Sequence, residues 1–200
     1  MLLDADDSQL VLVDYQARLM PAIADGPAVL ANAQRLAEMA RALRVPVWGT
    51  EQNPDKLGPN PPELRALCQR TLSKMHFSAV ADGLADWLRP PARPAGGNAR
   101  SLPKHLQKPA SAAPERTTIV VAGCEAHVCL LQTALELIEQ EFDVWVVTDA
   151  CGSRTERNRD AAFDRLAGAG AELVTTEMVA FEWLRTADHP SFKAVQALIK

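Results

Sequence analysis

The stretch TTIVVAGCEAHVCLLQTALELIEQ, residues 117–140, decides the fold. Residues 117–123 form an apolar run that ends in glycine, which is typical of a buried strand. From residue 127 to residue 140 apolar side chains recur at helical spacing, which predicts an amphipathic helix. A buried strand followed at once by a helix is half of a βαβ unit, so this stretch predicts a parallel sheet.

The same alternation extends in both directions along the chain. Further strands are predicted at residues 9–14, 45–50, 71–74, 143–150 and 171–176, and helices at 27–43, 61–70, 80–88, 155–170, 177–185 and 191–200. Six apolar strands separated by helices predict an α/β fold, namely a three-layer α-β-α doubly wound sheet of about six mainly parallel strands. In such sheets ligands bind beyond the carboxyl ends of the strands, where the strand order reverses.

Length and composition favour a single domain over residues 1–200. The chain is 48% hydrophobic, which is enough for one well-buried core. Residues 89–116 differ from the rest, because proline, glycine and serine are dense there and six Lys or Arg stand against one Glu. We predict a Pro/Gly-rich surface insertion in this segment.

The net charge and the hydropathy limit which binding partners and which cellular location are expected. The net charge of −4 argues against nucleic-acid binding, which normally needs a basic face. No apolar run approaches the roughly 20 residues that span a bilayer, so no membrane contact is expected. The acidic N-terminus does not resemble a secretory signal, and a cytoplasmic location follows as the expectation.

Three residues at predicted strand ends could carry chemistry. Asp14 ends the first strand, Lys74 ends the third, and Cys129 lies in the first turn of the helix after the fourth. The positive potential of a helix N-terminus would lower the thiol pKa, and its N–H groups could bind an oxyanion. The alternatives are that Cys129 faces the core, Asp14 caps a turn and Lys74 is solvated. A buried aspartate and lysine would, however, offset each other's loss of hydration.

The other cysteines and the nearby histidine have simpler interpretations. Cys68, Cys124 and Cys151 are predicted to be packing residues, since free cysteine is commonly buried. The chain contains no C-x-x-C pair, which leaves a zinc or thioredoxin-like site without support. His127 lies two residues before Cys129, and such neighbours do not share a helix face, so a Cys–His dyad is not expected.

Four segments carry a family resemblance. They are GCEAHVCLLQTALEL (123–137), DVWVVTDACGSR (143–154), LVLVDYQARLMPAI (10–23) and LSKMHFS (72–78). Together and in this arrangement they resemble the isochorismatase-like cysteine hydrolases, which are related to the nicotinamidases. The likeness covers almost the whole chain except residues 89–116.

The resemblance implies roles for individual residues. Cys129 would attack a carbonyl carbon, Asp14 would take the thiol proton and pass it to the leaving group, and Lys74 would hold Asp14. A cis peptide bond would join Cys124 to Glu125, and the N–H groups of Glu125 and Cys129 would form an oxyanion hole. Gln16 would support Asp14, and His127 would shape the turn.

Two departures from the family narrow the expected reaction. Metal-binding nicotinamidases carry histidines after the second strand, where this chain has Thr50-Glu51-Gln52-Asn53-Pro54, so neither a metal nor another cofactor is expected. Isochorismate-cleaving members lack the nucleophilic cysteine, so Cys129 points to cleavage of an amide-like C–N bond in a small molecule through a thioester.

Two other functions stay open, and so does the substrate. The chain could be a non-catalytic binding member of the fold or a thiol redox sensor. A homo-oligomer, dimer or tetramer, is also expected, with Trp87, Phe181 and Trp183 offering apolar surface to a partner.

Overall fold

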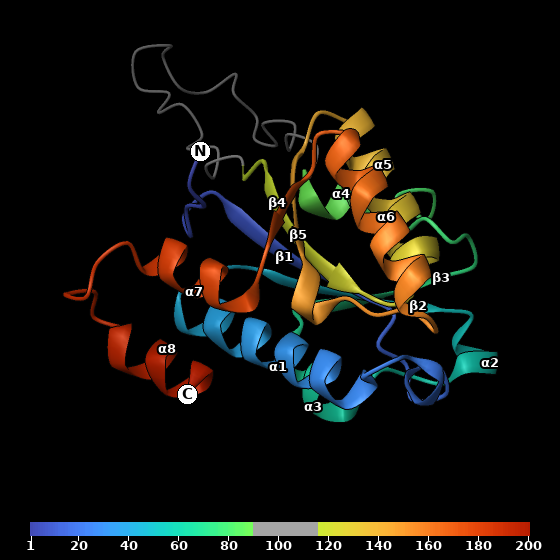
Figure 1. The fold of residues 1–200 in the computed structure, drawn as a ribbon, viewed down its shortest axis with the longest axis horizontal. Helices are drawn as coiled ribbons and strands as arrows, with labels where there is room; N and C mark the ends of the chain where they lie inside the picture. The colour runs from blue at the N-terminus through green and yellow to red at the C-terminus, as the bar shows by residue number, and fades with distance from the viewer. Residues whose placement is uncertain (90–115) are drawn as a thin grey trace, which may run out of the picture.

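A six-stranded parallel sheet forms the centre of the protein (Figure 1). The computed structural model describes residues 1–89 and 116–200. The strands are β1 (Ser8–Val13), β2 (Val47–Gln52), β3 (Arg70–Lys74), β4 (Thr118–Gly123), β5 (Asp143–Val147) and β6 (Glu172–Val174), in the order β3-β2-β1-β4-β5-β6. The doubly wound α/β fold expected from the sequence is therefore confirmed.

Helices cover both faces of the sheet. One face carries α1 (Gly26–Ala42), α3 (Pro62–Leu67), α7 (Thr176–Leu184) and α8 (Phe192–Ile199), and the other carries α4 (Leu84–Leu88), α5 (Leu131–Glu139) and α6 (Glu156–Gly168) (Figure 1). A short helix α2 (Pro54–Leu57) and 3₁₀ turns at Met20–Ala22 and Thr148–Ala150 were not predicted. Within the described residues no helix combines the length and apolar composition needed to cross a bilayer.

The strand order reverses between β1 and β4, the two central strands. Every residue of both strands is buried, which explains the apolar runs at residues 10–13 and 119–122. They pair in register from Ser8 opposite Thr118 to Val13 opposite Gly123. The segments that follow β1 and β4 therefore lie side by side at the carboxyl edge of the sheet, the edge at which ligands bind in such folds.

Several predicted boundaries were wrong for local reasons. The helix predicted at 80–88 begins only at Leu84, because Gly83 adopts a left-handed φ of 94° at its N-cap. The strand predicted at 143–150 ends at Val147, where the chain enters a 3₁₀ turn. A π-helical turn, Ala126–Leu130, precedes α5 and contains Cys129.

The predicted insertion at residues 89–116 lies outside the described residues, apart from its two end residues. The side chain of Gln9 links the residue before this segment to its last residue, because its Nε2 donates to the carbonyl oxygens of Leu88 at 2.8 Å and Arg116 at 3.0 Å. The segment thus leaves and re-enters the fold beside the start of β1.

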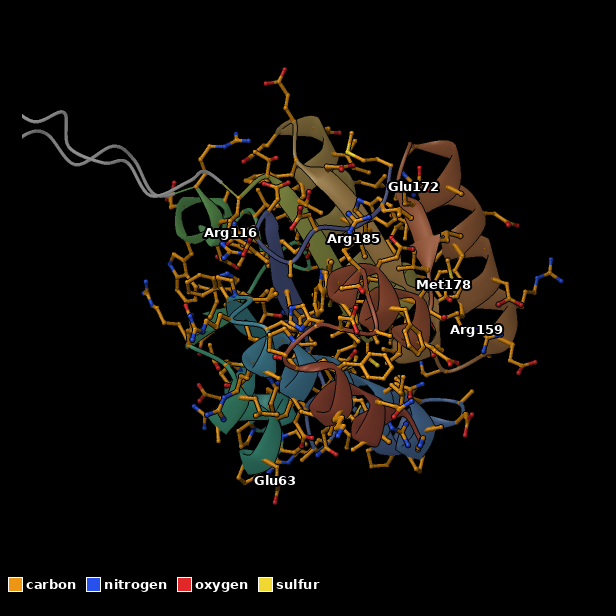
Figure 2. The ribbon with its side chains drawn as sticks, turned by 90° about the vertical axis from the view of Figure 1, so that its left-hand side faces the viewer. Glu63, Arg116, Arg159, Glu172, Met178 and Arg185 are labelled. Carbon is orange, nitrogen blue, oxygen red and sulfur yellow. The ribbon has the colours of Figure 1, made fainter. Side chains whose placement is uncertain are left out.

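Of the three aromatic residues expected to face a partner, only Phe181 is well exposed. Trp183 is in the core, where its Nε1 donates to Ser8 Oγ, so that expectation was wrong. Trp87 packs on Trp48 within the same chain, and the Arg70 guanidinium lies 3.8 Å from its ring. Figure 2 shows the face of the molecule that carries α7, with Met178 and Arg185 labelled.

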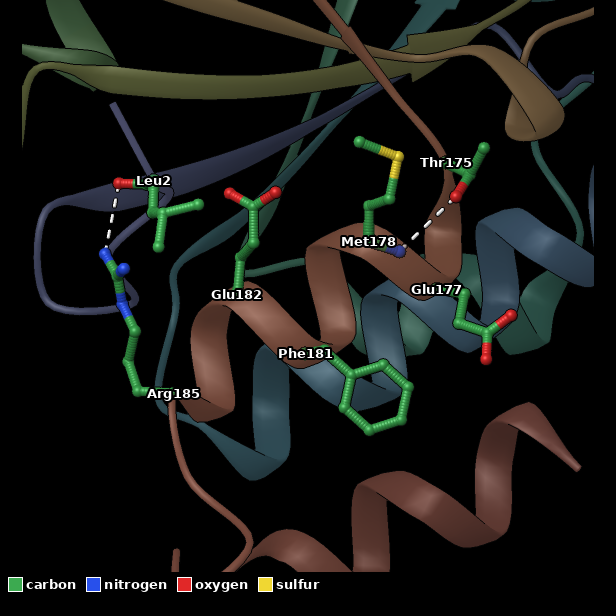
Figure 3. Close-up of a pocket in the computed structure, with 7 residues that line it drawn as sticks. All are labelled: Leu2, Thr175, Glu177, Met178, Phe181, Glu182 and Arg185. Carbon is green, nitrogen blue, oxygen red and sulfur yellow. Dashed lines mark hydrogen bonds between the residues drawn. The ribbon is translucent and has the colours of Figure 1, made fainter.

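Phe181 lines a hollow of about 470 Å³ on the surface of α7 (Figure 3). Met178 and Phe181 are each 44% exposed there, and Leu2 of the N-terminal segment is more exposed still. Arg185 donates to the carbonyl oxygen of Leu2, and Glu182 accepts a hydrogen bond from the N–H of Leu3. Asp14, Lys74 and Cys129 do not line this hollow.

The close approach of β1 and β4 gives a stability prediction. A Cβ added at Gly123 would lie 2.4 Å from the Val13 carbonyl oxygen, which is backbone and cannot easily move. We expect Gly123→Ala to lower the free energy of unfolding by about 1–3 kcal/mol, the usual cost of overpacking a core. Urea unfolding followed by far-UV circular dichroism measures the change.

Gly168→Ala is the matched control, because a Cβ at this helical residue would meet nothing within 4 Å. It should leave stability unchanged or raise it by up to about 1 kcal/mol. Equal unfolding midpoints for the two variants would contradict the importance of the β1–β4 approach.

Candidate active site

Asp14 follows β1 directly and is fully buried. Its backbone has a φ of 54°, a left-handed conformation that aspartate tolerates better than most residues, and its N–H donates to the Thr50 carbonyl at 3.2 Å. The Thr50 hydroxyl donates to Oδ1 at 2.7 Å, and the Lys74 ammonium lies 2.7 Å from Oδ2. Apart from Lys74, no nitrogen or oxygen donor of the described residues bonds Oδ2, so a lone pair is left for another proton.

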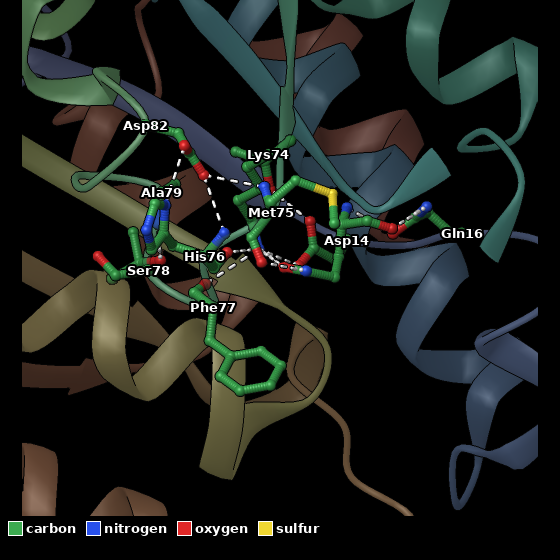
Figure 4. A network of polar contacts seen from close by, with 12 residues as sticks. Asp14, Gln16, Lys74, Met75, His76, Phe77, Ser78, Ala79 and Asp82 are labelled. Atoms are coloured by element: carbon green, nitrogen blue, oxygen red, sulfur yellow. Dashed lines mark hydrogen bonds and ion pairs between the residues drawn. The ribbon is translucent and has the colours of Figure 1, made fainter. Parts of the chain in front are cut away.

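Lys74 is the last residue of β3 and is buried, not solvated. Its ammonium is held by Asp14, by Gln52 Oε1 at 2.7 Å, and by the carbonyl oxygens of His76 at 3.3 Å and Phe77 at 3.0 Å (Figure 4). The side chains of Asp14 and Lys74 are both fully inaccessible. A charge pair so completely removed from water is typical of functional sites, although structural ion pairs also occur.

Cys129 lies in the turn Ala126–Leu130, immediately after β4, and is 6% exposed. Asp14 and Lys74 are the charged groups that act on its thiol, each partly through a side-chain hydrogen bond. The structure therefore brings together the three residues that the sequence analysis placed at three separate strand ends. They meet at the carboxyl edge of the sheet, where β1, β3 and β4 end.

The expected lowering of the Cys129 pKa was wrong. Burial, chiefly, and the Asp14 carboxylate raise the pKa of this thiol to about 12, even though Lys74 opposes both. Desolvation is the largest cause, because a thiolate loses its hydration in this site. Cys129 is therefore a neutral thiol at pH 7 and needs a base to become a nucleophile.

The turn after β4 contains a cis peptide bond between Cys124 and Glu125, as the family resemblance implied. The Glu125 carbonyl accepts hydrogen bonds from the N–H groups of Val128 and Leu130. The Glu125 N–H itself donates to no acceptor in the described part of the chain, which leaves it available beside Cys129. Arg154 fixes the Glu125 carboxylate through its backbone N–H and its Nε, at 3.0 and 2.9 Å.

The hydrogen bonds of Gln16 and His127 go to residues other than Asp14, Lys74 and Cys129. Gln16 and Gln52 form a reciprocal pair, in which Gln16 Nε2 donates to the Gln52 carbonyl and Gln52 N–H donates to Gln16 Oε1. Gln16 thus fixes the residue that binds Lys74. His127 contacts Ser153 and Asn158 through its two ring nitrogens, so it anchors the turn that contains Cys129.

The sequence analysis found Thr50 and Gln52 at a strand end but gave them no role. Both lie at the end of β2, between Asp14 on β1 and Lys74 on β3, and each bonds one of them. Glu51 is turned away and pairs with Arg65 at 3.3 Å. In the described residues no three His, Cys, Asp or Glu side chains are grouped as metal ligands.

The remaining cysteines are free thiols. Cys124 and Cys151 are buried, as predicted, and burial raises the pKa of each. Cys68 is half-buried, and burial raises its pKa to about 11. Cys68 lines a second surface hollow, near α1 and α3, and neither this hollow nor the one on α7 includes Asp14, Lys74 or Cys129.

The sequence of the chain matches a known protein family. A family model described as the isochorismatase domain matches residues 8–93 and 103–178. The chain belongs to the isochorismatase family. A curated member, isochorismatase domain-containing protein 2A of Mus musculus, is 36% identical over 195 residues, which are 98% of this chain and 84% of the mouse protein.

Several solved structures superpose closely on this chain. The MAR1 ribonuclease from Caenorhabditis elegans has a TM-score of 0.83 and 30% identity, over 100% of this chain and 92% of that one. YcaC from Pseudomonas aeruginosa, solved with hexane-2,5-diol and covalent acrylamide, has a TM-score of 0.77 and 26% identity, over 98% and 91%. The YcaC gene product of Escherichia coli, an octameric hydrolase of unknown specificity, has a TM-score of 0.77 and 27% identity, over 98% and 88%.

The raised pKa of Cys129 gives a testable pH dependence. Below the pKa the thiolate fraction grows tenfold per pH unit, so carbamidomethylation of Cys129 by iodoacetamide should accelerate roughly tenfold per unit between about pH 7 and pH 10, without a plateau. Asp14→Asn removes a charge that raises this pKa, so the profile should shift to lower pH. Peptide mass spectrometry gives the rate at Cys129 alone, and a plateau near neutral pH in the unmodified chain would contradict the assignment.

Proposed function

We propose that the protein is a metal-independent cysteine hydrolase that cleaves an amide C–N bond of a small molecule. The observation that carries this proposal is the fully buried Asp14–Lys74 ion pair against the Cys129 thiol. A neutral thiol needs a base within reach, and Asp14 is the carboxylate that acts on it. Thr50 and Gln52, at the place of the nicotinamidase metal ligands, are engaged with Asp14 and Lys74 instead.

The reaction begins with attack of the Cys129 sulfur on the carbonyl carbon. The thiol proton moves to Asp14 as the S–C bond forms, and the carbonyl electrons move to oxygen, where the N–H groups of Glu125 and Cys129 can donate. Collapse of this intermediate breaks the C–N bond, and the leaving nitrogen takes the proton from Asp14. A thioester on Cys129 and a free amine or ammonia result.

Water completes the cycle. Asp14, again a carboxylate, takes a proton from the water that attacks the thioester carbon. The S–C bond breaks, the sulfur regains the proton from Asp14, and a carboxylic acid leaves. Lys74 stays charged throughout, holding Asp14 in place and opposing the build-up of negative charge on sulfur.

A related structure supports an electrophile-reactive site in this fold. YcaC from Pseudomonas aeruginosa was solved with covalent acrylamide, a small amide that reacts with nucleophiles. In this chain Cys129, beside Asp14 and Lys74, is the nucleophile that could react in the same way. A non-catalytic binding member would need neither the buried pair nor the thiol beside it, and this complete set favours an enzyme.

The redox-sensor alternative is less well supported. A sensor cysteine needs thiolate character near neutral pH and an accessible sulfur, whereas Cys129 is buried and its pKa is raised to about 12. Cys124, the nearest cysteine in sequence, is itself buried and interacts with Cys151.

RNA is a second substrate class to test, because the Caenorhabditis elegans neighbour is named a ribonuclease. Two features of this chain disfavour it. The net charge is −4, and the ammonium of Lys74 is already neutralised by Asp14. We therefore expect single-stranded RNA to survive incubation with the protein while amides are cleaved.

We predict that a panel of small amides includes one that releases ammonia or amine with the unmodified protein and none with Cys129→Ala. A hydroxylamine-sensitive mass increase on Cys129 should appear during turnover, because hydroxylamine cleaves thioesters. Cys68→Ala is the matched control and should keep full activity, since Cys68 lies at a separate hollow. Turnover that survives Cys129→Ala would remove the thiol from the mechanism.

We also propose a homo-oligomer that uses the surface of α7. The Escherichia coli neighbour is octameric, and Met178 and Phe181 expose apolar surface here. Glu177, Phe181 and Arg185 follow one another at intervals of four residues. Arg185 caps the C-terminal end of α7, so two copies packed antiparallel about Phe181 would bring Glu177 of each toward Arg185 of the other, which pairs opposite charges.

Light scattering at micromolar concentration should therefore give a mass at least twice the 21.7 kDa of the chain. Phe181→Lys should lower that mass, because it places a charge at the centre of the contact. Phe77→Lys is the control, since Phe77 is another exposed phenylalanine, 53% exposed, on a different part of the surface. A monomeric mass for the unmodified chain would overturn the proposal.

A further inference from the structure

The loop of residues 75–83 follows Lys74 directly and helps to hold its ammonium. Two of the four oxygen atoms around Lys74 Nζ belong to this loop, namely the carbonyls of His76 and Phe77. An ammonium has three protons to donate, and no bulk water reaches Lys74 to replace a lost acceptor. The place of the ammonium therefore depends on where this loop puts its carbonyl groups.

Asp82 fixes the first half of the loop. Its Oδ2 accepts hydrogen bonds from the backbone N–H groups of Met75 and His76, each at 3.0 Å, and its Oδ1 lies 3.0 Å from His76 Nδ1 (Figure 4). All three contacts converge on the two residues next to Lys74. The carboxylate thus sets the path of the chain between the lysine and the carbonyls that bind it.

Asp82 is charged at physiological pH. Partial burial raises the pKa of its carboxyl, but the hydrogen bonds from His76 and Met75 outweigh this and hold the pKa below its ordinary value. A charged acceptor makes hydrogen bonds about twice as strong as a neutral one, so the clamp is stronger than a turn capped by a hydroxyl or an amide.

The second half of the loop is attached elsewhere. Ser78 Oγ donates to Glu136 at 2.6 Å, and the Ala79 N–H donates to Thr133 Oγ1 at 3.0 Å, which fixes both residues to α5. α5 continues from the turn that carries Cys129. Asp82 therefore fixes residues 75 and 76, and α5 fixes residues 78 and 79. The carbonyls of His76 and Phe77, which bind Lys74, lie between these two points of attachment.

We propose that Asp82 is a positioning residue of the hydrolytic site, which places the Lys74 ammonium against Asp14 and Cys129 by clamping residues 75 and 76. Asp82 touches none of these three residues itself. The proposal rests on the roles given to Asp14, Lys74 and Cys129 in the proposed function. A turn residue with a purely structural role would affect stability and leave the chemistry of the thiol unchanged.

The reactivity of Cys129 separates the two roles. Lys74 lowers the pKa of the Cys129 thiol, so an ammonium displaced by loss of the clamp should raise it. Asp82→Ala should shift the pH profile of Cys129 carbamidomethylation to higher pH and slow the reaction at fixed pH about 3- to 10-fold, since one pKa unit is a tenfold change in thiolate. With an amide that is cleaved, kcat should fall more than KM rises.

The controls use neighbouring residues. Asp86→Ala removes a carboxylate from α4 that has no hydrogen bond or ion pair in the described part of the chain, and it should leave the profile unchanged. His76→Ala removes one of the three contacts of Asp82 and should give a smaller shift in the same direction. If Asp82→Ala does not fold, Asp82→Asn replaces it, because asparagine keeps an acceptor for the backbone N–H groups. Its carbamidomethylation profile should shift to higher pH by less than complete loss of the clamp would produce.

A folded Asp82→Ala protein with an unchanged or faster carbamidomethylation profile would overturn the proposal and reduce Asp82 to a turn cap. Circular dichroism on the same preparation shows whether the protein is folded. The alkylation rate needs no turnover, so a shifted profile in a protein that cleaves no amide would leave this proposal standing while the proposed function fails.

Discussion

The ion pair between Asp14 and Lys74 is the interaction on which the rest of the site depends. The two charges lie 2.7 Å apart and are fully inaccessible, so each is tolerated in the interior only because of the other. Removing one partner of such a pair typically destabilises a protein by about 3–5 kcal/mol, yet two packed apolar residues would often be as stable as the intact pair. Stability alone therefore does not explain why the chain contains this buried pair. The contact of the pair with the buried Cys129 thiol gives a chemical explanation.

The topology of the sheet brings these groups together. Asp14 extends β1 in the centre, Lys74 ends the edge strand β3, and β2 lies between them with Thr50 and Gln52 bonding one residue each. The reversal of strand order places the turn after β4 on the other side of Asp14. Family membership is consistent with this arrangement, while the loop after Lys74 and its clamp are features that the fold alone does not dictate.

Hydrophobic periodicity was sufficient to predict the sheet, its two covered faces and the three strand-end residues, because those patterns are local. It could not predict what tertiary contacts determine. The pKa of Cys129 was expected to fall because only the helix end was considered, whereas burial and Asp14 raise it. Gln52, His76 and Phe77 as partners of Lys74, and the packing of Trp183 into the core, likewise depend on segments that are distant in sequence or on loop geometry without a periodic signal.

The central claim is that Asp14 takes the proton from a thiol that is neutral at pH 7. The most direct test is the rate constant for thioester formation at Cys129, from an amide that the protein cleaves, in the unmodified chain and in Asp14→Asn at equal concentrations of folded protein. Because loss of a positioned proton acceptor usually slows a reaction about 10²- to 10⁴-fold, the account predicts a fall of that size in Asp14→Asn. An undiminished rate of thioester formation in folded Asp14→Asn would contradict it.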